Sequence, residues 1–108
     1  MNEETSAKDI SIAQAVSFMR SNRPLRTEEL CRDYLSKNPG CTEHLRLLSH
    51  ALMKQNRLTE AEEKLRFAIS LSPNYPQLHE DLGSVFAMQS RFDEAIPELE
   101  KAIQLQPA

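Results

Sequence analysis

Histidine and cysteine are the residues of this sequence whose types and spacing come closest to a chemical site. Cys41-x2-His44 has the spacing of half a zinc site, in which a thiolate and an imidazole bind one ion. No second pair of ligands follows, so we expect no metal site. His44, His50 and His79 share no helix face with a Ser or Cys nucleophile and an orienting acid, so no catalytic triad is expected.

Carboxylate runs and phosphate-binding loops are the other chemical signals. Two acidic runs precede arginines at helical spacing: Glu28-Glu29 with Arg32, and Glu60 to Glu63 with Arg66. This spacing is typical of i,i+4 pairs on a helix surface rather than of acid/base partners. No P-loop or dinucleotide fingerprint is present. We therefore expect no catalytic residue and no cofactor, and predict that this chain is not an enzyme.

Composition limits the classes of partner and compartment. The chain has 108 residues, is 40% hydrophobic and carries a net charge of -3, which fits one small domain with its own core. The acidic balance argues against nucleic acid or an anionic membrane as a partner, and no apolar run is long enough to span a bilayer. Without a signal peptide, Cys31 and Cys41 are expected to be free thiols, so the predicted location is the cytoplasm.

The sequence repeats itself at an offset of 34 residues, and such a period predicts a solenoid. Residues 42–75 and 76–108 share ten identities at this offset, among them Leu65/Leu99 and Arg57/Arg91. The segment 8–41 shares eight with 42–75. We therefore divide the chain into an N-terminal tail (1–7), a degenerate first repeat (8–41), a second repeat (42–75) and a third (76–108).

Each repeat is predicted to contain two helices. Apolar residues at helical spacing place the first helices at 9–19, 42–55 and 76–89. Asn22, Asn56 and Ser90 follow them as expected left-handed turn residues. Thr59 and Asp93 are the expected caps of the later second helices, with Thr59-Glu60-Ala61-Glu62 as a capping box.

Prolines are expected to mark the helix boundaries. Pro39, Pro73 and Pro107 should close the second helices, and Pro76 suits a first turn. Pro24 is expected to start the second helix of the first repeat. Pro97 is placed in the first turn of the last helix, where proline costs at most one backbone hydrogen bond.

The second and third repeats resemble the tetratricopeptide pattern W-x2-L-G-x2-Y, A-x3-F, P. The third repeat matches it at His79-x2-Leu82-Gly83-x2-Phe86, Ala95-x3-Leu99 and Pro107; the second matches it at Leu45-x2-Leu48-Ser49-x2-Leu52, Ala61-x3-Leu65 and Pro73. The resemblance implies an all-α fold: three helix-turn-helix repeats, or six helices, in a right-handed superhelical solenoid. Leu65 and Leu99 are expected in its core.

The first helices carry a second stripe of residues beside the core stripe, and in this family that stripe lines the concave surface that holds a partner. The expected partner groove consists of the following residues of this stripe: Ile12, Val16, Met19, Glu43, Arg46, His50, Met53, Gln77, Glu80 and Ser84. Met19 and Met53 would supply adaptable apolar contact. Arg46 and His50 are expected to meet an acidic or C-terminal group of the partner. The alternative is that these residues form only a solvated face, with Ile12, Val16 and Met19 covering an edge of the core.

One specialisation of the family is predicted to be missing. Tetratricopeptide domains that clamp the acidic tails of chaperones carry Lys, Asn and Arg at fixed places on their first helices. Here those places hold Ile12 and Val16, then Leu47, then Gln77 and Asp81. We therefore expect no chaperone-tail clamp.

Three functions remain open. The favoured one is a protein–protein interaction module that holds a partner segment in the groove. The run from Glu29 to Leu35 also resembles the first repeat of bacterial proteins that carry tetratricopeptide repeats ahead of a sulfotransferase domain, which implies an accessory role beside a catalytic domain beyond residue 108. The third is self-association: the apolar residues Leu99, Ile103 and Leu105 on the last helix predict that the chain is either a fragment of a longer repeat array or a homodimer through the C-terminal repeat.

Overall fold

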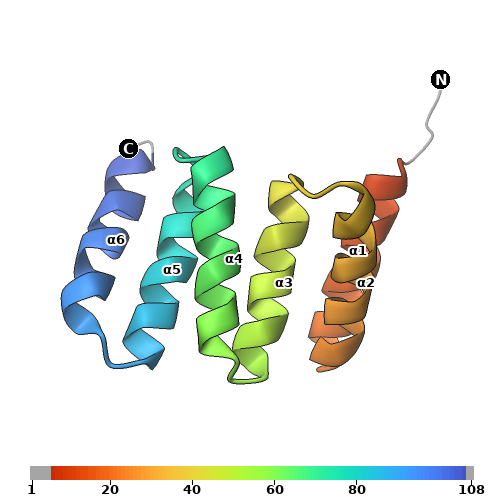
Figure 1. Ribbon diagram of the computed structural model, residues 1–108, viewed down its shortest axis with the longest axis horizontal. Helices are drawn as coiled ribbons and strands as arrows, with labels where there is room; N and C mark the ends of the chain where they lie inside the picture. The colour runs from red at the N-terminus through yellow and green to blue at the C-terminus, as the bar shows by residue number, and fades with distance from the viewer. Residues whose placement is uncertain (1–5, 107–108) are drawn as a thin grey trace.

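The computed structural model describes residues 6–106 and contains six α-helices in three antiparallel pairs (Figure 1). Their bounds are α1 Ala7–Arg20, α2 Pro24–Lys37, α3 Thr42–Lys54, α4 Leu58–Leu71, α5 Pro76–Met88 and α6 Phe92–Leu105. No strand occurs within residues 6–106. The predicted all-α fold of three helix pairs is confirmed. Residues 1–5 of the expected tail and Pro107 lie outside the described residues.

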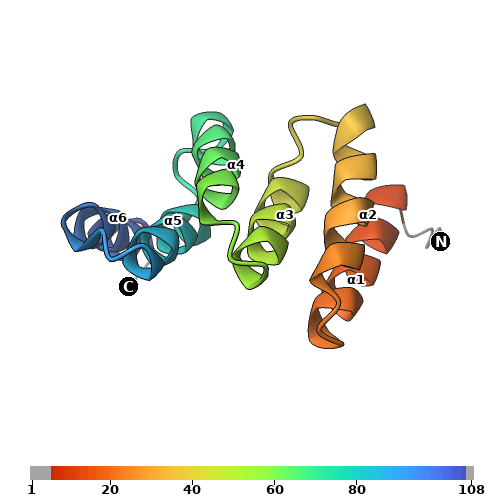
Figure 2. The same ribbon diagram turned by 60° about the horizontal axis from the view of Figure 1, so that its bottom comes forward.

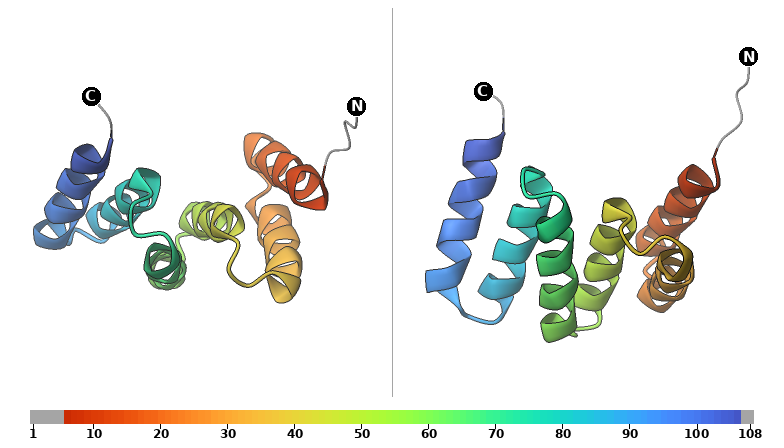
Figure 3. Two further views of the ribbon diagram at one scale, coloured as in Figure 1. Left: turned by 90° about the horizontal axis from the view of Figure 1, so that it is seen from above. Right: turned by 45° about the horizontal axis from the view of Figure 1, so that its top comes forward.

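The pairs stack in chain order to form an elongated solenoid of 46 × 32 × 23 Å. Each helix packs on the next one along the chain, and α1 also contacts α3. In Figure 2, α1 and α2 lie together at one end of the long axis, and α3, α4, α5 and α6 follow in order toward the other end. Seen from above, α1, α3 and α5 lie toward one side, with α2 and α4 toward the other (Figure 3, left). The first helices therefore share one surface of the solenoid.

The turn inside each pair is set by one residue with a left-handed backbone. Asn22, Asn56 and Ser90 have φ values of 58°, 59° and 60°, as the sequence predicted. Asparagine tolerates this region better than most residues with a side chain. The left-handed residue reverses the chain within three residues, so α1 and α2, α3 and α4, and α5 and α6 run antiparallel.

The second helices α4 and α6 begin earlier than predicted, and their expected caps are wrong. The helix α4 starts at Leu58, so Arg57 is the N-cap residue and Thr59 lies inside the helix without capping it. The side chain of Glu60 instead accepts a hydrogen bond of 2.8 Å from Nε of Arg57. Asp93 likewise lies inside α6. The tight turn leaves no room for extra residues before the helix, and an arginine–glutamate pair takes the place of the capping box.

Prolines mark the boundaries much as expected. Pro24 and Pro76 lie in the first turns of α2 and α5. Pro39 and Pro73 directly follow the C-cap residues of α2 and α4. Pro97 does not lie in a first turn, because α6 begins at Phe92 and places it within the helix. It still removes one backbone donor there.

A single apolar core runs through the stack. Leu48, Leu52, Leu65 and Leu82 are at most 2% exposed, and small residues such as Ala61 allow the helices to approach closely. The expectation that Leu99 is a core residue is wrong, because its side chain is 36% exposed. The equivalent Leu65 is covered by the following helix pair, whereas no helix within the described residues covers that side of α6.

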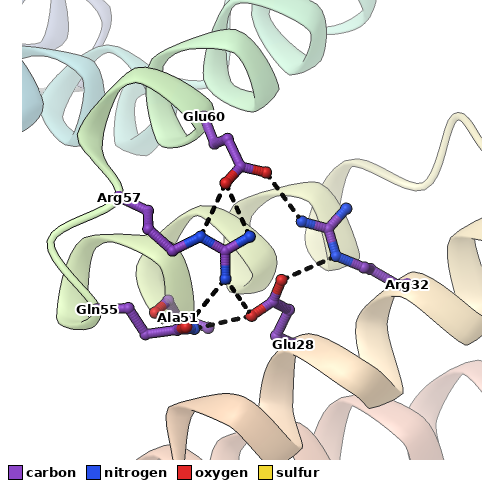
Figure 4. A network of polar contacts seen from close by, with 6 residues as sticks. All are labelled: Glu28, Arg32, Ala51, Gln55, Arg57 and Glu60. Carbon is purple, nitrogen blue, oxygen red and sulfur yellow. Dashed lines mark hydrogen bonds and ion pairs between the residues drawn. The ribbon is translucent and has the colours of Figure 1, made fainter.

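Polar side chains join neighbouring repeats on the second helices (Figure 4). Glu28 of α2 accepts a 2.9 Å hydrogen bond from Arg32, the predicted i,i+4 pair, and a 2.7 Å one from Arg57 of the next repeat. Arg57 also holds Glu60 at 2.7 Å. The same pattern recurs one repeat later, where Arg91 lies 2.8 Å from Glu62. Several of the 34-residue identities therefore mark inter-repeat ion pairs, not only core contacts.

Candidate partner-binding groove

The first helices α1, α3 and α5 present the predicted groove residues on their common side. None of the ten is buried: Glu80 is exposed and the other nine are half-buried. Partial burial is what a ligand-contacting surface requires, because each side chain is held by neighbours yet remains accessible. The ten predicted residues come from three helices, and the structure leaves all of them at least partly accessible.

An apolar pocket of about 410 Å³ lies at one end of this surface. We call it the methionine pocket, and its lining residues are Met19 of α1, His50, Met53 and Lys54 of α3, and Met88 of α5. Met53 packs against the core, whereas Met88 is 50% exposed. Met88 was not among the predicted groove residues. Its place beside Met19 and Met53 depends on how the three helices pack, which one helix's periodicity cannot give.

Arg46 and His50 do not point freely into the groove, because both hold Asp81 of α5. Nε of Arg46 donates to Oδ2 of Asp81 at 2.7 Å, and Nε2 of His50 lies 2.9 Å from the same oxygen. Burial raises the pKa of Asp81, but the hydrogen bonds from His50 and Arg46 outweigh it and hold the pKa below its usual value. A carboxylate of the chain itself thus occupies the place predicted for a partner's acid.

Asp81 was noted only as a place where the chaperone-tail clamp is missing, and its role in the groove was not predicted. It follows Gln77 by four residues and precedes Ser84 by three, so helical spacing alone places it on the same stripe. That spacing could have found it. Nothing local, however, indicates that Arg46 and His50 would reach it across the gap between α3 and α5.

The far end of the groove holds a second ion pair. Nζ of Lys8 lies 3.2 Å from Oε1 of Glu43. A backbone N–H and the Lys8 ammonium hold the pKa of Glu43 below its usual value, although burial opposes them. Two charged residues of the predicted groove, Glu43 and Arg46, thus already form ion pairs within the chain.

Comparison with known families identifies this architecture. The family model described as "Tetratricopeptide repeat" matches residues 12–76 and 46–108, which together cover most of the sequence. The chain belongs to the tetratricopeptide repeat family.

Solved structures share the fold of this tetratricopeptide chain. "Crystal structure of MamA" superposes with a TM-score of 0.83 at 23% identity, over 90% of this chain and 57% of that one. The second TPR of Spaghetti (RPAP3), bound to the HSP90 peptide SRMEEVD, gives 0.83 at 18% identity over 89% of each chain. MamA residues 41–end from Desulfovibrio magneticus RS-1 give 0.82 at 17% identity, over 88% and 54%. The chain thus spans little more than half of these two MamA chains.

A search of curated protein sequences returned no match. None of these comparisons tests the resemblance to a sulfotransferase-linked repeat, which stays a prediction. No helix within residues 6–106 is long and apolar enough to cross a bilayer.

The half zinc site is part of the junction between the first two tetratricopeptide repeats. His44 is fully buried, and its Nε2 lies 2.8 Å from Oγ of Ser11 and its Nδ1 3.1 Å from Sγ of Cys41. Its ring stacks on Tyr34 with centroids 3.8 Å apart. Burial lowers the pKa of His44, so the imidazole is neutral at pH 7. Within residues 6–106 no group of three candidate ligands could hold a metal ion.

The remaining histidine of this tetratricopeptide chain is also held by packing partners. Nε2 of His79 donates to the carbonyl oxygen of Pro73 at 2.7 Å, and Nδ1 lies 2.9 Å from Glu98. Both ring nitrogens of His79 are therefore engaged. Cys31 is a fully buried free thiol whose pKa burial raises to about 12.

A second apolar surface lies on α6, away from the groove. We call it the outer face of α6, and it consists of Phe92, Ile96, Leu99 and Ile103, which are 56%, 54%, 36% and 70% exposed. Two of the three predicted self-association residues, Leu99 and Ile103, belong to it, whereas Leu105 is half-buried. Ile96 stands where the two earlier repeats carry the inter-repeat carboxylates.

Proposed function

We propose that the chain is a protein-binding module whose groove on α1, α3 and α5 holds an extended or helical segment of a partner protein. The observation that carries this proposal is the methionine pocket, an accessible apolar hollow built from three helices of three repeats. Concave, mostly apolar hollows with a few polar groups at their edge are typical of binding sites. The bound peptide in the structurally similar RPAP3 domain supports the same use of the fold.

The ion pairs define the part that each groove residue plays in this proposal. Met19, Met53 and Met88 supply apolar contact, and Glu80 remains open to a polar partner group. Arg46 and His50 act through Asp81. The ionised carboxylate of Asp81 pairs with both residues and thereby joins α5 to α3. Replacing Arg46 and His50 together by Glu would place three carboxylates side by side, so such a variant would lose stability as well as binding.

The test is selection of binding peptides from a random displayed library with the full chain as bait. Selected peptides are then measured against Met88→Lys and a matched control, Leu71→Lys. Both positions lie in the last turn of a helix and are about equally exposed, at 50% and 46%. Lysine suits a last turn because it complements the helix dipole. We expect binding to be lost in Met88→Lys and kept in Leu71→Lys, with equal loss in both contradicting the groove.

We also propose a homodimer through the C-terminal repeat, supported by the outer face of α6. Each of these side chains is about half exposed, so burying two of them would contribute roughly 1.5–3 kcal/mol. Light scattering over a range of concentrations should detect a dimer, and Ile103→Glu should return it to a monomer. A monomer at every concentration would remove this proposal without touching the groove.

The thiols and the net charge support a proposal for the compartment and the class of partner. The free thiols of Cys31 and Cys41 support a reducing compartment, such as the cytoplasm, and an acidic chain supports a protein partner over nucleic acid. We propose that the chain binds rather than catalyses, with repeats at 8–41, 42–75 and 76–108. An accessory role beside an enzyme is the alternative, and the full reading frame of the gene tests it.

A further inference from the structure

Methionines are distributed in this chain in an unusual way. The sequence contains four, and three of them, Met19, Met53 and Met88, line the methionine pocket. The fourth, Met1, lies outside the described residues. The three come from three different helices of three repeats. We propose that this pocket binds an aromatic side chain of the partner segment together with a carboxylate beside it, an inference that rests on the proposed function.

The thioethers favour an aromatic ring over an aliphatic side chain. Methionine side chains are flexible, and their polarisable sulfur atoms make favourable contacts with aromatic rings at about 5 Å. Three of them around one hollow can surround a ring from several sides. The volume of about 410 Å³ is in the range of small-ligand pockets and therefore accommodates one such ring.

The pocket wall next to these methionines is held in place before any partner arrives. The imidazole of His50 is fixed by its 2.9 Å contact with Asp81, which Arg46 also binds. Met53 is packed against the core. A wall that is already ordered loses little conformational entropy when a ring is bound.

The charge at the pocket favours a carboxylate as the partner group beside the aromatic ring. Lys54 is the residue in the lining that carries a permanent charge, its side chain is exposed, and the lining contains no carboxylate. The nearby carboxylate of Asp81 is already paired with Arg46 and His50. A partner carboxylate beside the aromatic side chain would therefore meet the Lys54 ammonium without a competing acid in the lining. The cation can also interact with the face of the bound ring.

The test uses three small probes that separate the ring from the carboxylate. N-acetyl-L-phenylalanine carries both groups, N-acetyl-L-phenylalaninamide lacks the carboxylate, and N-acetyl-L-leucine lacks the ring. The chain is labelled with ¹³C at the methionine methyl groups, and its NMR spectrum is recorded during each titration. Signals are assigned with Met→Leu variants. We expect ring-current shifts at the methyls of Met19, Met53 and Met88 with the two aromatic probes, and the tightest binding with N-acetyl-L-phenylalanine.

Two conservative variants test the assigned roles. Lys54→Gln should weaken N-acetyl-L-phenylalanine about two- to fivefold, to the level of the amide, and leave the amide unchanged. Met53→Leu, which keeps the volume, should weaken both aromatic probes roughly two- to tenfold and leave N-acetyl-L-leucine unchanged. Circular dichroism checks that both variants fold.

Three results would overturn the inference: no shift at the pocket methyls, equal binding of the leucine probe, or no effect of Lys54→Gln on the acid. The peptides selected in the library experiment separate this inference from the proposed function. Groove-binding peptides without an aromatic residue next to an acid would refute the specificity but keep the binding module. Failure to select any groove-dependent peptide would refute the binding module itself, whatever the small probes do.

Discussion

Leu65 and Leu99 offer a matched pair for testing how the stack is stabilised. They are the same residue at the same position of successive repeats, 34 residues apart. Leu65 is fully buried in α4, whereas Leu99 of α6 is 36% exposed. Replacing each by alanine removes the same atoms from different surroundings, so any difference in stability reports the covering helices.

The expected magnitudes follow from burial. Leu65→Ala removes a fully buried side chain and leaves a closed cavity, which costs about 3–5 kcal/mol of the free energy of unfolding. Leu99→Ala removes a side chain that is about two-thirds buried, and the space left is open to water, so we expect roughly 1–2 kcal/mol. For a domain of this size, each kcal/mol shifts the melting temperature by about 4–8 °C.

Thermal and urea unfolding, followed by far-UV circular dichroism, measure both variants beside the unchanged chain. Leu65→Ala should melt at least about 4 °C below Leu99→Ala, because the two expected losses differ by about 1 kcal/mol or more. The measurements use dilute protein, so that association through α6 does not bury Leu99 and add to the stability. An equal loss in the two variants would mean that Leu99 is covered in solution, and a larger loss at Leu99 would refute the core assignment.

Three further outcomes are expected from the packing around Gly83, the two thiols and His44. A Cβ at Gly83 would lie 2.7 Å from Cγ of Leu99, so Gly83→Ala should lower the melting temperature. In a double-mutant cycle, Gly83→Ala should cost less stability when Leu99 is already alanine than when it is leucine, because the clash is then removed. Of the two thiols, Cys41 should react with a chromogenic disulfide in the folded chain, while Cys31, with its pKa raised to about 12, should react only after unfolding. His44 should titrate below its ordinary value of about 6.5 when followed by NMR. Since the unfolded chain takes up this proton first, the contribution of His44 to stability should fall as the pH drops below about 6.5.

A separate prediction concerns the peptide bound by the RPAP3 domain. The positions of the chaperone-tail clamp hold Leu47, which packs against the core, and Asp81, which is already paired. Neither can bind the carboxylates of an acidic tail. Calorimetric titration with SRMEEVD should therefore detect no binding, and binding at the groove would show that another set of cations replaces the clamp.

The sequence by itself determined the local structure of this protein. Helical spacing of apolar residues gave the existence of the helices, and asparagine's tolerance of a left-handed backbone gave the turns at Asn22 and Asn56. These features depend on residues within a few positions of one another. The starts of α4 and α6 were misplaced, because Thr59 had the right side chain for a cap but Arg57 already occupied that position.

Only the tertiary structure decided which side chains meet and which remain exposed. Asp81 binds Arg46 and His50 across two helices, and Met88 joins Met19 and Met53, because the spacing of stacked helix pairs brings distant positions together. Neither contact leaves a local signal. The two leucines of the repeat show the reason most directly. Leu65 and Leu99 have the same place in the pattern, but burial depends on the neighbouring helix pair and not on the residue itself.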